Sequence, residues 1–158
     1  MASIFDRRRL TSRQMRTVAD RRFDDAVCLC DSGQNARANG VFYLGGFVIE
    51  CLLKARLLDQ YSSVANAVAV DKLSPAERQI WNLIYRSHDL DEMLAHLPGI
   101  DSRLGSADRS DGRDRLRKLR LICSEWTIFA RYSPLSSTMR DASEFLNDVR
   151  ELKEWLKL

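Results

Sequence analysis

The chain has 158 residues, of which 45% are hydrophobic and 30% charged, a composition that favours a folded domain over a disordered chain. Its formal net charge of +3 is too small to indicate nucleic-acid binding by itself. Three prolines and seven glycines leave long intervals uninterrupted, which suits helices better than short strands. We therefore expect a single domain over residues 1–158, with residues 1–10 as a flexible segment.

The first predicted helix covers about Thr11 to Asp31. Its apolar residues recur at steps of three and four positions, which places them on one face of an amphipathic helix. Those residues are Met15, Val18, Ala19, Phe23, Ala26, Val27 and Cys30. Ser32 and Gly33 follow and are suited to ending the helix.

The second predicted helix, Gly40 to Leu58, has the sequence GVFYLGGFVIECLLKARLL. Its uninterrupted apolar part ends at Ile49, well short of the roughly 20 residues that cross a bilayer. Glu50 and Lys54 follow, and charged side chains inside a membrane are expensive. We therefore expect a central core helix and no membrane segment. The glycines at 40, 45 and 46 would let a neighbouring helix approach closely.

Residues 59–76 are predicted to be a less regular connection. It ends in a helix start, with Ser74 as the cap and Pro75 in the first turn. A further helix start lies in SHDLDEMLAHL, where Asp89 and Glu92 have the spacing of a capping box. The proline and glycine that follow this segment are expected to end its helix.

Residues 99–114 form the most polar stretch of the chain and are predicted to be a mobile loop. A helix is expected from Arg115 to about Phe129, followed by a break at Pro134. The last helix is expected from about Ser137 to Lys157. No strand pattern is present, so the sequence predicts an all-α fold, an antiparallel bundle of four to five helices.

Arginines gather in two parts of the sequence. Residues 1–22 hold seven arginines against two aspartates, and residues 101–120 hold six arginines and a lysine against four aspartates. Such patches can contact a phosphate backbone. They can equally be a solvated helix face and a polar loop, and both interpretations stay open at this point.

Cysteines and histidines give no sign of a metal site. The cysteines at 28, 30, 51 and 123 show neither metal-ligand spacing nor a disulfide framework, so we interpret them as buried free thiols in a reducing cytoplasm. His88 and His96 are eight residues apart, which is not the HExxH spacing. No phosphate loop or dinucleotide motif indicates a cofactor. The basic N-terminal residues lack an apolar core behind them, so no secretory signal is expected.

Glu50 is the most informative charged residue. Lys54 lies four positions later, so both side chains share one helix face with the carboxylate in the favourable N-terminal position. The pair can be a modest ion pair on a helix edge. Alternatively, Glu50 is buried among apolar neighbours and needs a partner, which Lys54, Arg131 or His88 could supply. A carboxylate held in that way would organise a polar cleft.

Three segments resemble the HEPN domain (higher eukaryotes and prokaryotes nucleotide-binding). They are the helix with Glu50 to Ala55, "HDL" at His88 to Leu90, and "RYSP" at Arg131 to Pro134, and with their flanks they span about residues 20–155. The resemblance implies an all-α bundle, usually a homodimer with a polar cleft between protomers. It also implies a toxin–antitoxin or phage-defence setting, with a nucleotidyltransferase as one kind of partner.

HEPN ribonucleases use an arginine followed, four to six residues later, by a histidine. Here Arg86 lies only two positions before His88, no arginine stands at the required distance before His96, and no histidine follows Arg131. An in-line ribonuclease mechanism would therefore lack its imidazole. No catalytic residue is expected on this basis.

The leading hypothesis is a non-catalytic HEPN-like protein that binds a nucleotide, a nucleic acid such as RNA, or a protein partner. Its expected ligand-binding residues are Glu50, Lys54, His88, Asp89, Arg131 and Tyr132. One alternative is a metal-independent ribonuclease toxin with a degenerate site that uses Arg86 or Arg131 with His88. The other is a purely structural subunit of a defence complex.

Overall fold

The computed structural model describes residues 9–102, 109–133 and 137–157. These residues contain helices and no strand, so the predicted all-α class is confirmed. The long helices are α1 (Ser12–Asp31), α2 (Ala38–Gln60), α4 (Pro75–Tyr85), α7 (Arg109–Glu125) and α8 (Met139–Lys157). The short elements are η1 (Asn35–Arg37), α3 (Ser62–Ala65), η2 (Val70–Lys72), α5 (Leu90–Ala95), α6 (Gly99–Ser102) and η4 (Ile128–Tyr132).

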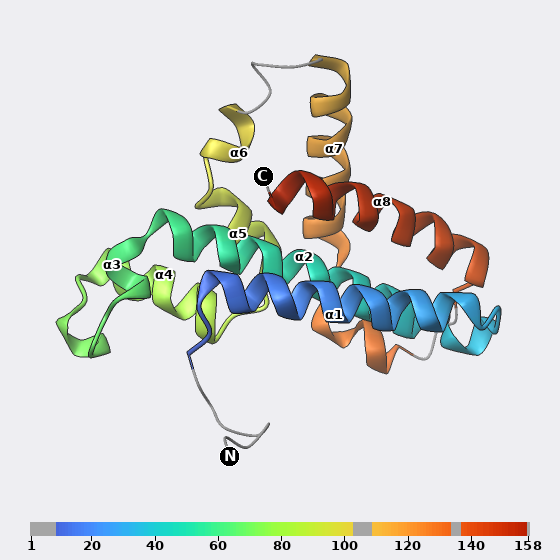
Figure 1. Cartoon of the computed structure of the whole chain (residues 1–158), viewed down its shortest axis with the longest axis horizontal. Helices are drawn as coiled ribbons and strands as arrows, with labels where there is room; N and C mark the ends of the chain where they lie inside the picture. The colour runs from blue at the N-terminus through green and yellow to red at the C-terminus, as the bar shows by residue number, and fades with distance from the viewer. Residues whose placement is uncertain (1–8, 103–108, 134–136, 158) are drawn as a thin grey trace.

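Helices are slightly more numerous than the four to five expected, because the connections coil into short helical turns such as α3 and α6. Residues 1–8, most of the segment expected to be flexible, lie outside the described residues. In Figure 1, α1 and α2 form an antiparallel hairpin, and α7 crosses the direction of α8. No helix in the described ranges has a stretch long and apolar enough to cross a membrane.

Helix α2 is the centre of the molecule, as predicted. It contacts α1, α8, α4, α5 and η4. From Val48 to Ala55 every residue is buried, so the helix is covered on all of its faces over two turns. This explains why the sequence of α2 shows an apolar run in place of an amphipathic stripe.

The predicted helix starts are present. Ser74 caps α4, with its hydroxyl accepting from the Glu77 backbone N–H at 3.3 Å and the Glu77 carboxylate accepting from the Ser74 N–H at 2.9 Å. Pro75 occupies the first turn. Asp89 caps α5 by accepting from the Glu92 N–H at 2.9 Å, but the Glu92 carboxylate bonds α4 instead of closing the capping box. These caps satisfy backbone donors that a helix start leaves unpaired.

The predicted loop over 99–114 is helical at both of its described ends. Helix α6 occupies the first four residues, and α7 begins at Arg109, six residues before the expected start; residues 103–108 lie outside the described residues. The early start is stabilised by Asp111 in the first turn, beside the positive end of the helix dipole. Helix α7 also ends earlier than expected, at Glu125, and η4 follows as a separate 3₁₀ turn.

Two glycines of α2 allow very close packing, as their positions predicted. A Cβ atom on Gly45 would lie 2.5 Å from the ring of Phe145 in α8. One on Gly46 would lie 2.0 Å from the indole nitrogen of Trp126. That nitrogen donates to the Phe42 carbonyl of α2 at 3.2 Å, which fixes the ring in this place. The segment between α7 and α8 therefore packs directly on the backbone of α2.

We predict that Gly46→Ala destabilises the protein. The added methyl group collides with a ring that a hydrogen bond holds in position, and overpacking of this kind costs about 1–3 kcal/mol. The free energy of unfolding from urea titration should fall by that amount. Gly99→Ala is the matched control, because a Cβ there meets nothing within 4 Å. Equal stability of the two variants would contradict the packing argument.

Candidate functional site

The carboxylate of Glu50 is buried, with an exposed fraction of 1% for the residue. Lys54, one turn further along α2, places its Nζ atom 2.7 Å from Glu50 Oε1. The same ammonium donates to the Ser87 carbonyl at 2.9 Å. The pair is therefore a buried ion pair that also holds the turn between α4 and α5, and the helix-edge interpretation is wrong.

His88 is the second partner of Glu50. Its Nδ1 atom lies 3.0 Å from both carboxylate oxygens, while 42% of the histidine side chain is exposed. When Glu50 is ionised, Nδ1 carries the proton and donates to the carboxylate. Nε2 is then the ring nitrogen that remains for solvent or a ligand. Glu50, Lys54 and His88 form a polar cluster, which we call the Glu50 triad, that runs from the core to the surface.

The remaining predicted site residues lie elsewhere or have other roles. Asp89 is exposed, and its carboxylate caps α5. Tyr132 ends η4, and the next residue, Ser133, accepts from Asn39 Nδ2 at 3.4 Å. Asn39 precedes Glu50 by eleven residues on α2, which is about 16 Å along the helix axis. Tyr132 is therefore not brought to the Glu50 triad.

Arg131 belongs to η4, at the same end of α2 as Tyr132, and its side chain lies outside the part of the chain that the structure describes. Of the three partners considered for Glu50, the contacts found are those with Lys54 and His88. Spacing on one helix was enough to indicate Lys54. His88 comes from another segment, and the sequence offered it only as one of several candidates.

The buried cysteines are poor nucleophiles. Burial raises the pKa of Cys51 to about 12, and the neighbouring Glu50 carboxylate adds to the rise. Burial likewise raises the pKa of Cys123 to about 12. Both stay protonated thiols at neutral pH. Cys28 is exposed and Cys30 half-buried, so the expectation that all four cysteines are buried is wrong for α1, whose buried face ends at Ala26.

A groove that the sequence did not indicate lies between α7, η4 and α8, with a volume of about 920 Å³. Its inner part is apolar and aromatic, with Phe42 of α2 and Phe145 of α8 in contact at 4.8 Å between ring centroids. Trp126 lies beside them. Leu121, Phe129 and Tyr132 also line the groove, although they are 49%, 70% and 66% exposed. Leu121 and Phe129 are apolar residues of the segment from Arg115 in which the sequence predicted a helix.

Acidic side chains surround this apolar interior. Glu125 comes from α7, and Asp141, Glu144 and Asp148 come from α8. Among the described residues that line the groove, the one of opposite charge is Lys118. Its ammonium lies 3.0 Å from Asp148, 2.8 Å from Glu151 and 3.2 Å from Asp114. The cation is thus already engaged by carboxylates, and Glu144 is paired with Arg140 at 3.2 Å. The charges of the described lining residues remain negative in sum.

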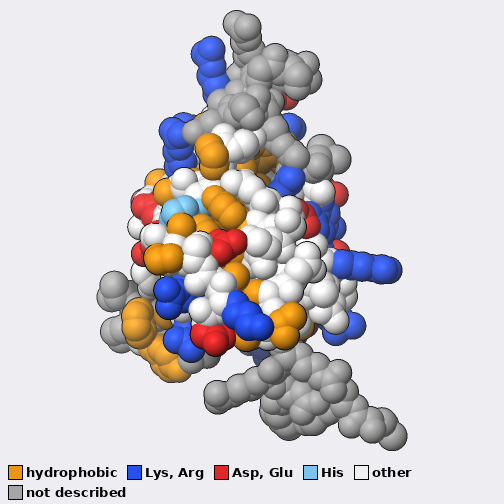
Figure 2. All heavy atoms as spheres, turned by 90° about the vertical axis from the view of Figure 1, so that its left-hand side faces the viewer, with side chains coloured by type: hydrophobic (Ala, Val, Ile, Leu, Met, Phe, Trp, Pro, Cys, Tyr) orange, Lys and Arg blue, Asp and Glu red, His pale blue; other side chains and the backbone are white. Residues whose placement is uncertain are grey.

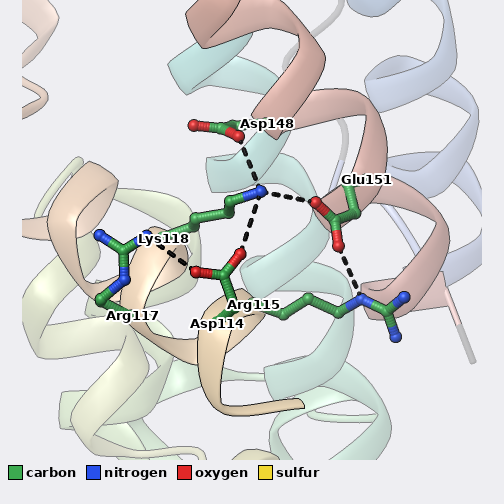
Figure 3. A network of polar contacts seen from close by, with 6 residues as sticks. All are labelled: Asp114, Arg115, Arg117, Lys118, Asp148 and Glu151. Atoms are coloured by element: carbon green, nitrogen blue, oxygen red, sulfur yellow. Dashed lines mark hydrogen bonds and ion pairs between the residues drawn. The ribbon is translucent and has the colours of Figure 1, made fainter. Parts of the chain in front are cut away.

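The contacts of Lys118 belong to a wider ion-pair network that joins α7 to α8 (Figure 3). Arg115 Nε lies 3.0 Å from Glu151, and Arg117 lies 2.8 Å from Asp114. Hydrogen bonds from Lys118 and then Arg115 hold the pKa of Glu151 below its ordinary value. The network fixes the crossing of α7 and α8, and therefore the edge of the groove.

The same network answers part of the question about the arginine-rich segments. Three of the basic residues in 101–120 are already paired with carboxylates within the molecule. Arg16 of the other segment pairs with Asp59 of α2. On the face shown in Figure 2, the described basic side chains stand among acidic and apolar ones. This interspersed surface gives little support to a phosphate-backbone contact.

The described residues contain no group of three or more side chains suited to holding a metal ion. No family model, curated protein or solved structure matches the chain. The function is therefore inferred from the Glu50 triad, the acidic groove and the motifs of the sequence.

We predict that Glu50→Gln is strongly destabilising. It leaves the Lys54 ammonium in the interior without a counter-charge, and breaking a buried pair costs about 3–5 kcal/mol. Urea unfolding measures the loss. Replacing both partners, Glu50→Leu with Lys54→Met, should recover much of it, because the double variant buries no unpaired charge. A Glu50→Gln variant within about 0.5 kcal/mol of wild type would show that the pair is not structural.

We predict that acid weakens the α7–α8 network. Because the folded-state pKa of Glu151 is lowered, its stabilisation is complete above the unfolded-state pKa, about 4.3 for glutamate, and is lost as pH falls through the folded-state value. The free energy of unfolding measured at a series of pH values should decline less steeply in Lys118→Met. Lys72→Met is the control on an exposed lysine. Parallel pH profiles for both variants and wild type would contradict this assignment.

Proposed function

We propose that the chain is a non-catalytic, HEPN-like helical protein that binds a protein partner in a toxin–antitoxin or phage-defence setting. The motifs around Glu50, His88 and Arg131 support the HEPN-like class. The lack of an arginine four to six residues before a histidine supports a non-catalytic role. A homodimer and a nucleotidyltransferase partner are part of the same proposal, because the resemblance implies them.

The acidic groove is the observation that favours a protein over a nucleotide or RNA. The described residues on its lining include four carboxylates and one lysine, and the lysine is engaged by carboxylates. Glu144 is paired with Arg140, yet the sum of these charges stays negative and repels phosphate groups. Aromatic and leucine side chains stand exposed on the same lining. Clustered exposed apolar side chains with a polar rim are typical of protein–protein interaction sites.

The Glu50 triad has a mainly structural role in this proposal. Both carboxylate oxygens of Glu50 are engaged by Lys54 and His88, so they are not offered to a ligand. The triad attaches the turn before α5 to the centre of α2. The triad then contributes to binding by holding the helices in place. His88 is its exposed member.

One observation favours the ribonuclease toxin as the second candidate. A histidine whose Nδ1 is held by a buried carboxylate has the arrangement of an oriented general base. Such a mechanism also needs a cation for the developing phosphorane. Arg86 is held over the ring of Trp81, 5.0 Å from its centroid, by a cation–π contact. This contact engages the arginine nearest to His88 in sequence.

The two candidates are separated by incubating the purified protein with labelled tRNA and total RNA. We expect no cleavage by wild type, and no rise in melting temperature with millimolar nucleotides, because neither is a ligand of the acidic groove. His88→Ala should behave like wild type in both assays. Cleavage that disappears in His88→Ala would establish the ribonuclease instead. A melting temperature that rises with nucleotide concentration would refute the choice of a protein ligand.

Homodimer formation is tested by size-exclusion chromatography with light scattering. We expect a dimer at micromolar protein concentration, as the HEPN resemblance implies. A monomer under those conditions would remove the homodimer from the proposal without affecting the protein-binding groove.

A further inference from the structure

Exposed hydrophobic side chains are concentrated at one place on the molecule. Among the described residues, the large hydrophobic side chains that are exposed are Val68, Leu121, Phe129 and Tyr132, and the last three line the groove between α7, η4 and α8. Phe129 is 70% exposed even though it lies only three residues after the core residue Trp126. An exposed phenylalanine ring lacks the stabilisation that burial would give it, so contact of this ring with another apolar surface is favoured.

Side chains of α7 and α8 form two walls of the groove. The residues of α7 on the groove are Lys118, Leu121, Ile122 and Glu125, and those of α8 are Asp141, Glu144, Phe145 and Asp148. Each set follows the spacing i, i+3, i+4, i+7, which is one face of a helix over two turns, or about 10 Å. Because α7 crosses α8 (Figure 1), the two faces meet at an angle at the contact of Lys118 with Asp148, and an amphipathic helix can lie on the apolar floor between them.

The described residues contain no strand, so a partner cannot bind here by adding a strand to a sheet edge. The charge of the lining further restricts the partner. Carboxylates stand on both walls, Glu125 on α7 and Glu144 on α8. Glu144 also pairs with Arg140 at 3.2 Å, and an exposed pair of this kind is weak enough to be exchanged for a partner's cation. A bound helix would therefore present an apolar face to the floor and basic side chains to either wall.

We propose that this groove binds an amphipathic helix of a partner protein, with large apolar residues on one face and arginine or lysine along both edges of that face. The inference rests on the proposed function in taking the ligand to be a protein. Phe129 and Leu121 pack against the apolar face of the incoming helix. Glu125 and Glu144 pair with its basic edges.

The test uses two synthetic, fluorescein-labelled peptides of about five helical turns, each with a leucine face. One carries lysine and arginine on the flanks of that face, and the other carries glutamate. Titration by fluorescence anisotropy at low salt should give about tenfold or greater preference of wild type for the basic peptide. Phe129→Asp should abolish this binding, and its melting temperature should stay close to that of wild type because the ring is exposed.

Charge reversal provides the decisive comparison. Glu125→Lys with Glu144→Lys should exchange the preference, so that the acidic peptide binds better. Asp24→Lys with Asp31→Lys is the matched control: it makes the same change in net charge at exposed positions of α1 that do not line the groove, and it should keep the preference for the basic peptide.

Several results would overturn the inference. If the two double variants change the peptide preference equally, the preference arises from the net charge of the protein and not from the groove. If neither peptide binds, the groove is rejected as a helix-binding site. The RNA and nucleotide assays would still decide the proposed function separately. A homodimer that dissociates in Phe129→Asp would assign the groove to a second copy of the chain. If single-stranded RNA competes with the peptide for wild type but not for the groove variants, both proposals are rejected.

Discussion

The burial of one carboxylate constrains the rest of this fold. Glu50 lies in the centre of α2, where a charge away from water requires partners close by. Lys54 meets this need from the same helix, and His88 meets it from the turn between α4 and α5. Because Lys54 also binds the Ser87 carbonyl, that turn can occupy only a narrow range of positions on α2. The start of α5, and the layer that α5 forms with α7, follow from this attachment.

The N-terminal half of α2 is organised by two glycines, which have no side chain to keep neighbouring residues away. Gly45 and Gly46 let Phe145 and Trp126 pack on the helix backbone, which draws the start of α8 and the segment after α7 onto the same surface. Helix α7 itself crosses α8 and is held there by the ion pairs of Lys118 and Glu151 (Figures 1 and 3). Two helices that cross cannot cover each other along their whole length. The groove is the space that this crossing leaves beside η4.

The sequence was informative where structure depends on neighbours along the chain. Caps at Ser74 and Asp89 and the pairing of Glu50 with Lys54 follow from spacings of three or four residues, and the core helix α2 follows from its apolar run. It failed where the deciding contact is distant. The residues of α7 before Arg115 are polar and resemble a loop, yet they are helical. Asp114 among them pairs with Lys118, which also bonds Glu151 of α8, 33 residues further along the chain. Phe129 resembles a core residue in the pattern, and only the packing of η4 on α2 shows that its ring faces outward.

The Glu50 triad and the groove between α7, η4 and α8 also differ in how accessible they are to a ligand. The Glu50 triad is closed, because its carboxylate oxygens are used by the fold itself. The groove is open, but its floor is held in place: Trp126 donates a hydrogen bond to the Phe42 carbonyl and lies against the buried Gly46 of α2. A partner entering such a groove does not have to order the floor first, so little of the binding free energy is spent on conformational entropy. The glycine contacts of α2 therefore fix the aromatic side chains on which a ligand would lie, whereas the Glu50 triad attaches the turn before α5 to the same helix.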